Sequence, residues 1–167
     1  MIKKLNHLGI IMDGNRRFAK RLLKNPWNGH SMGARKVEEV LDWCYEQKIP
    51  TVTLYALSLE NLNTRPKKEL DFLMNIFKKE FTSENFHNKL HKNKTCVRFF
   101  GKLKLLPKEL QEIIQDIVEI TKNYNNTYLN FAIAYSGRQE IIEAIKKLDE
   151  KNISNLDEKT FEKYLYT

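Results

Sequence analysis

Three short segments of the sequence carry side chains whose types and spacing suit the binding of a phosphorylated ligand. The first segment, Met12–Lys20, reads Met-Asp-Gly-Asn-Arg-Arg-Phe-Ala-Lys and sets the carboxylate Asp13 close to two arginines, Arg16 and Arg17. Arginine side chains and the N–H groups that open a helix bind phosphate oxygens, and a carboxylate oxygen suits Mg²⁺. Because Asp-Gly is also common in ordinary turns, this segment taken alone fits a purely structural turn equally well.

The other two segments add polar side chains at comparable places. Gly29–Gly33 contains His30 and comes just before an amphipathic helix, although a lone histidine at such a place is usually incidental. Tyr55–Pro66 follows an apolar run and supplies four polar side chains, Ser58, Glu60, Asn61 and Arg65. Ligands of parallel sheets bind beyond the carboxyl ends of the strands, so we expect the three segments to converge there.

Hydrophobic periodicity predicts strands that alternate with helices. Apolar runs predict strands at 7–12, 51–57, 95–100 and 128–134. Apolar residues at helical spacing predict helices near 37–47, 70–81, 107–120 and 138–148, and a short one within 156–165. The Lys- and Asn-rich stretch 87–94 is predicted to be a polar connector. The alternation predicts an α/β fold with a mainly parallel sheet flanked by helices.

The bulk composition is that of one globular domain, which we expect to span residues 1–167. With 41% apolar and 30% charged residues, a chain of 167 residues can form a core. Its start lacks the apolar part of a secretory signal, and no run approaches the roughly 18 apolar residues of a membrane helix. We therefore expect a cytoplasmic protein, in the cytosol or on a membrane surface. Cys44 and Cys96 lie in apolar segments and are expected to be buried.

The charge balance favours an anionic partner. Lys and Arg outnumber Asp and Glu by 29 to 21, a formal net charge of +8. Nucleic acid, anionic lipid and phosphorylated small molecules all satisfy this condition. A nucleic-acid surface would interleave aromatic residues with Lys and Arg, whereas the Phe and Tyr residues here fall mostly in apolar stripes. We expect no nucleic-acid partner.

The three segments, together with Asn130–Arg138, resemble the cis-prenyltransferases, that is, the undecaprenyl and dehydrodolichyl diphosphate synthases. The resemblance runs from about residue 7 to residue 148, and the doubled arginine looks closer to the eukaryotic-type dehydrodolichyl diphosphate synthases. It implies an apolar tunnel between sheet and helices. It also implies condensation of isopentenyl diphosphate with an allylic diphosphate such as farnesyl diphosphate, giving a precursor of a dolichol-type lipid for protein glycosylation.

The same resemblance implies a role for each site residue. Asp13 would coordinate Mg²⁺, the implied cofactor, and help the allylic diphosphate leave. Asn61 would orient isopentenyl diphosphate or relay the proton lost on condensation, and because asparagine is a poor base we expect a relay through a neighbouring group. The implied substrate-binding residues are Gly14, Asn15, Arg16, Arg17, Phe18, His30, Ser58, Glu60 and Arg65.

The predicted helix 70–81 offers lining residues for the tunnel. Its apolar stripe contains Leu70, Leu73, Met74 and Phe77. A stripe with this period is also the ordinary mark of a helix that faces the core, so core packing explains it equally well.

Two features depart from the family pattern. Pro26 stands where the family usually has a basic residue, which leaves Lys24 as a substitute. Residues 154–167 contain no match to the family's Arg-x-x-Gly-Glu motif. We therefore expect the domain to be incomplete at its C-terminus and to show little or no chain elongation by itself; the alternatives are that a partner subunit supplies the missing groups or that activity has been lost.

The resemblance also implies partners. It suggests a homodimer or a heterodimer with a related cis-prenyltransferase subunit, and peripheral contact with the endoplasmic reticulum membrane. The alternative function is a catalytically impaired or non-catalytic subunit of a heteromeric enzyme. Asp13 argues against this alternative, because a scaffold has no need for a carboxylate among phosphate-binding arginines.

Overall fold

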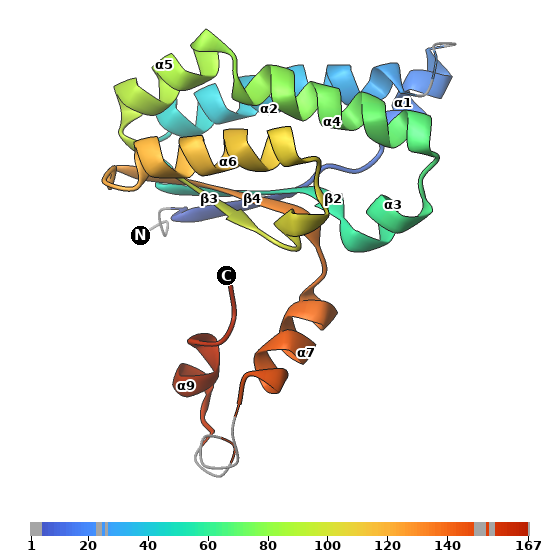
Figure 1. Cartoon of the computed structure of the whole chain (residues 1–167). Coiled ribbons are helices and arrows are strands. Elements are labelled where there is room, and N and C mark those ends of the chain that lie inside the picture. The colour runs from blue at the N-terminus through green and yellow to red at the C-terminus, as the bar shows by residue number, and fades with distance from the viewer. Residues whose placement is uncertain (1–4, 23–24, 26, 149–152, 154–155, 167) are drawn as a thin grey trace.

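The structure is a computed structural model that describes residues 5–22, 25, 27–148, 153 and 156–166. At its centre four parallel strands lie in the order β1-β2-β4-β3 (Figure 1). The strands are β1 His7–Ile11, β2 Thr51–Ser58, β3 Thr95–Phe100 and β4 Thr127–Tyr135. All four coincide with predicted strands, and the predicted α/β class with a parallel sheet is confirmed.

Helices follow the strands, and four of them cover one face of the sheet. The helices are α1 Asn15–Arg21, α2 Asn28–Glu46, α3 Leu59–Thr64, α4 Lys67–Phe81, α5 Glu84–Asn93, α6 Lys108–Thr121, α7 Gly137–Lys146 and α9 Glu158–Glu162, with a short 3₁₀ turn η1 at Leu103–Leu105. In Figure 1, α2, α4, α5 and α6 lie above the sheet, and α7 and α9 lie on its other side. The carboxyl ends of the strands point toward α1 and α3.

The core lies between the sheet and this helical layer. Side chains of the sheet such as Leu54 and Leu129 are almost fully buried, as are Leu110 and Ile117 of α6. Phe81 of α4 packs against aromatic rings from α5, β3 and β4 at centroid distances of 5.1 to 5.9 Å. Full burial of one such side chain contributes about 1.5 to 3 kcal/mol, so this layer dominates the stability of the fold.

The stretch 87–94 differs from its prediction, because most of it forms helix α5 and not a connector. Ser83 caps this helix by accepting a hydrogen bond from the Phe86 N–H at 3.2 Å. Leu90, one turn after Phe86, is buried. A single apolar pair at helical spacing among Asn, His and Lys residues is too weak a pattern to predict a helix.

Two expectations drawn from composition can be compared with the structure. Cys44 and Cys96 are buried and free, as predicted, and burial raises the pKa of the Cys44 thiol. Among the described helices, none has the length and hydropathy that a membrane crossing requires.

Candidate functional site

The carboxyl ends of β1 and β2 lie side by side and bring two of the polar segments together. Ile11 pairs with Tyr55, and the Met12 N–H donates to the Tyr55 carbonyl at 3.1 Å. The chain then turns at Asp13 and Gly14, where Gly14 has φ +85° and donates its N–H to Asp13 Oδ1 at 2.6 Å. A positive φ of this size favours glycine. The turn starts α1 directly beyond the strand.

Helices α1 and α2 approach each other closely at two glycines. A Cβ atom at Gly29 would lie 2.0 Å from the Asn15 carbonyl oxygen and 3.2 Å from the Ala19 Cβ. A Cβ at Gly33 would lie 2.5 Å from Asn15 Nδ2. Since no side chain fits at Gly29, this position must be glycine for α1 to lie against α2. The approach places His30 of α2 close to the arginines of α1.

A buried carboxylate, Glu69 of α4, lies at the centre of the site. It is fully buried, and its Oε1 accepts a hydrogen bond from His30 Nε2 at 3.1 Å. The same oxygen lies 3.7 Å from Arg16 Nε and 3.6 Å from Arg65 Nε. Glu69 therefore connects nitrogen-bearing side chains from α1, α2 and the end of α3. Sequence reasoning missed this residue.

The surroundings of His30 and Arg65 change their protonation behaviour. Burial lowers the pKa of His30, and the positive charges of Arg65 and Arg16 act in the same direction, whereas the hydrogen bond that His30 donates to Glu69 opposes them. Burial likewise lowers the pKa of Arg65. A neutral His30 that donates through Nε2 to Glu69 has only an acceptor at Nδ1. It therefore orients Glu69 and does not itself donate to a bound anion unless it gains a second proton.

Two buried atoms of this cluster have unused hydrogen-bonding capacity. Within the part of the chain that the structure describes, Glu69 Oε2 and Arg65 Nε have no hydrogen-bond partner. Buried polar atoms without a partner are rare in folded proteins and often mark sites that take a further polar group. Each of these two atoms could therefore form one more hydrogen bond, with a ligand or a water molecule.

A cavity of about 310 Å³ opens in front of the cluster, and we call it the basic cavity. Its walls are formed by Met12, Asp13, Gly14, Asn15, Arg16, Arg17, Lys20, His30, Asn61 and Arg65. Asp13 has a 76% exposed side chain, and its Oδ2 lies 2.9 Å from Arg17 Nη2. Because such an exposed pair contributes little to stability, both groups can turn toward a ligand at small cost.

Most of the residues that the sequence predicted for the site line the basic cavity, but three of them do not. The excluded residues are Ser58, Glu60 and Phe18. The Ser58 hydroxyl accepts the Asn61 N–H at 3.0 Å and so caps α3, while Glu60 and Phe18 are exposed. Lys20 lines the cavity and was not predicted. Lys24 and Pro26 lie outside the described residues.

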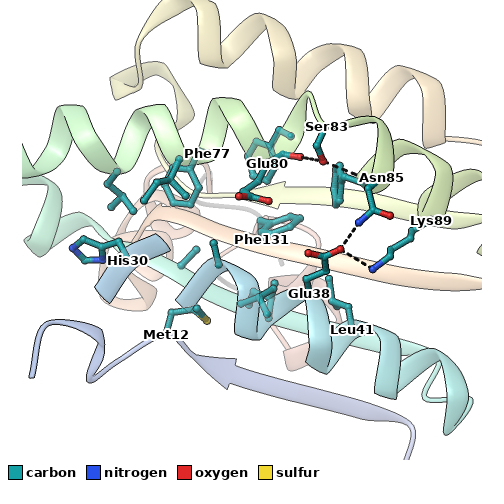
Figure 2. Close-up of a pocket in the computed structure, with 18 of the residues that line it drawn as sticks. Met12, His30, Glu38, Leu41, Phe77, Glu80, Ser83, Asn85, Lys89 and Phe131 are labelled. Atoms are coloured by element: carbon teal, nitrogen blue, oxygen red, sulfur yellow. Dashed lines mark hydrogen bonds and ion pairs between the residues drawn. The ribbon is translucent and has the colours of Figure 1, made fainter. Parts of the chain in front are cut away.

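A second cavity, of about 130 Å³, lies between α2, α4, α5 and the sheet (Figure 2), and we call it the apolar cavity. It shares Met12, Asn15, His30 and Arg65 with the basic cavity, so the two adjoin. Of the predicted tunnel residues, Leu73 and Phe77 line it. Leu70 and Met74 do not.

The described residues contain no group of three or more His, Cys, Asp and Glu side chains that could hold a metal ion. Mg²⁺ is commonly bound in a different way, by one or two carboxylates together with substrate phosphates and water. Asp13, an exposed carboxylate on the wall of a cavity lined by arginines, fits that second mode.

The sequence matches the family described as "Putative undecaprenyl diphosphate synthase" over residues 11–167. The chain belongs to this cis-prenyltransferase family. The match includes every residue of the basic cavity, so the family assignment and the site concern the same part of the chain.

Curated relatives carry more specific names. Proteins of Methanopyrus kandleri and Methanocaldococcus jannaschii named tritrans,polycis-undecaprenyl-diphosphate synthase (geranylgeranyl-diphosphate specific) are 45% and 46% identical to this chain and cover 96% of it. This chain spans 61% and 59% of their lengths. These names give no support to the predictions of dolichol synthesis, protein glycosylation or an endoplasmic reticulum location.

Solved structures agree with the family. The crystal structure of lavandulyl diphosphate synthase from Lavandula x intermedia in complex with dimethylallyl diphosphate has a TM-score of 0.84 and 28% identity, covering 97% of this chain and 71% of that one. A probable undecaprenyl diphosphate synthase from Campylobacter jejuni has a TM-score of 0.73 and 29% identity, covering 98% and 70%. The predicted cis-prenyltransferase fold is confirmed.

Proposed function

We propose that the chain carries the allylic diphosphate site of a prenyltransferase that condenses isopentenyl diphosphate with an allylic prenyl diphosphate. The observation behind this proposal is the junction of the two cavities, where Asn15, His30 and Arg65 line both. An allylic prenyl diphosphate has the same two parts, an anionic head and an apolar tail. A substrate that lies across the junction would match each part with side chains of suitable polarity.

The proposed reaction moves one prenyl group. The C–O bond between the allylic carbon and the diphosphate breaks, and the diphosphate leaves with the electron pair. The terminal alkene carbon of isopentenyl diphosphate forms the new C–C bond, and loss of a proton from the carbon beside the resulting cation restores a double bond. Arg16, Arg17 and Lys20 would stabilise the negative charge that develops on the leaving group, which lowers the barrier.

Asp13 is the proposed Mg²⁺ ligand, and the metal would neutralise part of the charge on the leaving diphosphate. Asn61 lines the same cavity as Asp13 and is the proposed group for orienting isopentenyl diphosphate or relaying its proton. Arg65 is the proposed partner of the second diphosphate, and Glu69 would hold Arg65 in place. Phe18, Ser58 and Glu60 remain predictions from the sequence.

We further propose geranylgeranyl diphosphate as the primer ahead of farnesyl diphosphate. The support is the substrate in the names of the two relatives, which are more than two fifths identical to this chain. The proposed product is a cis-polyprenyl diphosphate of undecaprenyl type. Dimerisation and membrane contact stay predictions.

Calorimetric titration with Mg²⁺ tests the proposal. Geranylgeranyl diphosphate, farnesyl diphosphate and inorganic diphosphate are titrated into the wild-type chain and into Arg17→Ala. We expect geranylgeranyl diphosphate to bind most tightly and every ligand to bind more weakly to Arg17→Ala. Absence of binding for all three ligands would overturn the proposal. Because little or no chain elongation is expected from this chain by itself, binding of the allylic diphosphate, and not incorporation of isopentenyl diphosphate, is the measurement that decides.

A further inference from the structure

His30 lies where the two cavities meet and uses one ring nitrogen to hold Glu69. Its Nε2 forms a hydrogen bond of 3.1 Å with Glu69 Oε1. The residue lines both the basic cavity and the apolar cavity, and Figure 2 shows its ring at one end of the apolar cavity. Within the residues that the structure describes, Nδ1 has no hydrogen-bond partner. Nδ1 is therefore the nitrogen that is left for a ligand.

The charged groups that face His30 come from three neighbouring elements. Arg16 belongs to α1, Arg65 follows α3 and Glu69 belongs to α4, and their side chains meet His30 at Glu69 Oε1. Burial lowers the pKa of His30, and the two arginines reinforce this effect while Glu69 opposes it. We therefore expect a neutral imidazole in the free chain at neutral pH.

The charge around His30 changes sign when a diphosphate enters the basic cavity. Six charged side chains line this cavity or contact its wall, namely Arg16, Arg17, Lys20, Arg65, Asp13 and Glu69. Four of them are cationic and two are carboxylates, which leaves an excess of positive charge. The terminal phosphate of a diphosphate brings about two negative charges near pH 7, and the inner phosphate adds more. The net charge around His30 thus turns from positive to negative.

A neutral His30 is also poorly matched to the ligand in its hydrogen bonding. With the proton on Nε2, the imidazole has only an acceptor at Nδ1, and phosphate oxygens are acceptors as well. A proton on Nδ1 converts these two facing acceptors into a charge-assisted hydrogen bond, which is about twice as strong as a neutral one. Hydrogen bonding and charge therefore both favour a protonated His30 in the complex.

We propose that a diphosphate entering the basic cavity draws a proton from the solvent onto Nδ1 of His30, so that the site binds the ligand and a proton together. This inference rests on the proposed function, because it assumes that the diphosphate lies in the basic cavity. The imidazolium then donates to Glu69 through Nε2 and to the ligand through Nδ1. Because the leaving diphosphate gains negative charge during prenyl transfer, it would hold this proton most firmly and return it to the solvent on release.

The first test reads the protonation state of His30 from the ring nitrogen signals of the wild-type chain by NMR at about pH 7. Sequential assignment identifies His30 among the four histidines of the chain. The free chain should show one N–H on this ring, at Nε2. Saturating inorganic diphosphate should add a second N–H at Nδ1. Mg²⁺ is left out, because its charge opposes the proton. His7, His87 and His91 do not line the basic cavity and should stay unchanged.

The second test counts the proton by calorimetry. Inorganic diphosphate is titrated at about pH 7 in two buffers that differ in their enthalpy of ionisation, and the difference in heat gives the number of protons taken up. We expect the wild-type chain to take up about one proton more than His30→Gln. Its affinity should also rise more steeply as the pH falls, by up to about tenfold per pH unit.

His7→Gln is the matched control for His30→Gln. His7 is exposed and does not line the basic cavity, so this variant should take up as many protons as the wild-type chain. Thermal melting shows whether each variant is folded, and the NMR test needs no variant.

The outcomes separate the proton from the site itself. Binding of inorganic diphosphate with the His30 ring still protonated at Nε2 alone would overturn this inference and leave the proposed function intact. Equal proton uptake by the wild-type chain and a folded His30→Gln would overturn it as well. If inorganic diphosphate binds neither with nor without Mg²⁺, the proposed function itself fails, and this inference fails with it.

Discussion

Two carboxylates contact the arginines of the site, and their surroundings are opposite. Glu69 is fully buried, and its Oε1 lies within 3.7 Å of nitrogen atoms from Arg16, His30 and Arg65. Asp13 has a 76% exposed side chain and pairs with Arg17 at the wall of the basic cavity. One negative charge is enclosed by protein, and the other faces the solvent.

This difference separates two tasks that a diphosphate site must combine. Cations that bind an anion repel one another before the ligand arrives, and a buried counter-charge such as Glu69 holds them at fixed positions. A metal ligand must instead remain free to meet the metal and the substrate, as Asp13 is. Loss of Glu69 should therefore appear chiefly in stability, and loss of Asp13 chiefly in ligand binding.

The largest expected effect is the loss of stability in Glu69→Gln. The substitution leaves cationic groups near a buried site without their counter-charge, and removal of one partner from a buried pair costs about 3 kcal/mol. Urea denaturation measures the free energy of unfolding. Glu109→Gln is the control, because Glu109 forms an ion pair with Lys78 at an exposed position and should change stability by less than about 1 kcal/mol. Equal effects in the two variants would contradict the central role of Glu69.

The same two carboxylates show how far the site could be predicted from sequence. Asp13 follows a strand-like run and precedes arginines, so its neighbours along the chain indicate its chemistry. Glu69 contacts Arg16 and His30, which are distant in the sequence. The sequence did offer one indication of Glu69, which is its position. It lies one helical turn before Leu73 and so falls on the apolar stripe of α4. A charged residue at a core position indicates a special role, but the partners that satisfy it come only from the fold.

The fold was predictable to the extent that its elements bury apolar residues in a regular pattern. β2 and β4 are apolar runs, and α4 and α6 carry full apolar stripes. Helix α5 was missed because it buries little more than Leu90. Helix α3 has only six residues, too few for a period to be recognised.

The next effect concerns α1, which supplies one arginine to each carboxylate. In Gly29→Ala the added Cβ would lie 2.0 Å from the Asn15 carbonyl oxygen, which belongs to the backbone and cannot rotate away. We expect a loss of about 2 kcal/mol in the free energy of unfolding, typical of overpacking, together with weaker binding of inorganic diphosphate. Gly9→Ala is the control, since nothing lies within 4 Å of its added Cβ. Wild-type stability in Gly29→Ala would show that α1 does not depend on this contact.

Asp13→Asn tests the exposed carboxylate of the two. Because Asp13 is largely solvated, the free energy of unfolding should change by no more than about 0.5 kcal/mol. Mg²⁺ should raise the affinity of the wild-type chain for geranylgeranyl diphosphate. In Asp13→Asn this increase should be about tenfold smaller, because the amide oxygen carries no negative charge to attract the metal. Calorimetry with and without Mg²⁺ measures this difference.

Glu60→Gln is the control for Asp13→Asn. Glu60 is an exposed carboxylate on α3 that the sequence also predicted for substrate binding, and it does not line the basic cavity. We expect it to keep the wild-type dependence on Mg²⁺. A larger loss in Glu60→Gln than in Asp13→Asn would reassign the metal ligand.

The smallest expected effect is a pH dependence of stability that originates at His30. Burial and the charges of Arg65 and Arg16 lower its pKa below the ordinary 6.5, against the opposing contact with Glu69. The unfolded chain therefore binds more protons than the folded chain below this value, so the free energy of unfolding falls as the pH drops through about 6.5, by at most about 1.4 kcal/mol per pH unit. His30→Gln should lose this part of the slope in urea denaturation at about pH 7.5 and 5.5, whereas His7→Gln, at an exposed position, should keep it. An unchanged slope in His30→Gln would mean that the cluster around Glu69 accommodates a charged imidazole, and that His30 can donate to a bound anion without unfolding the site.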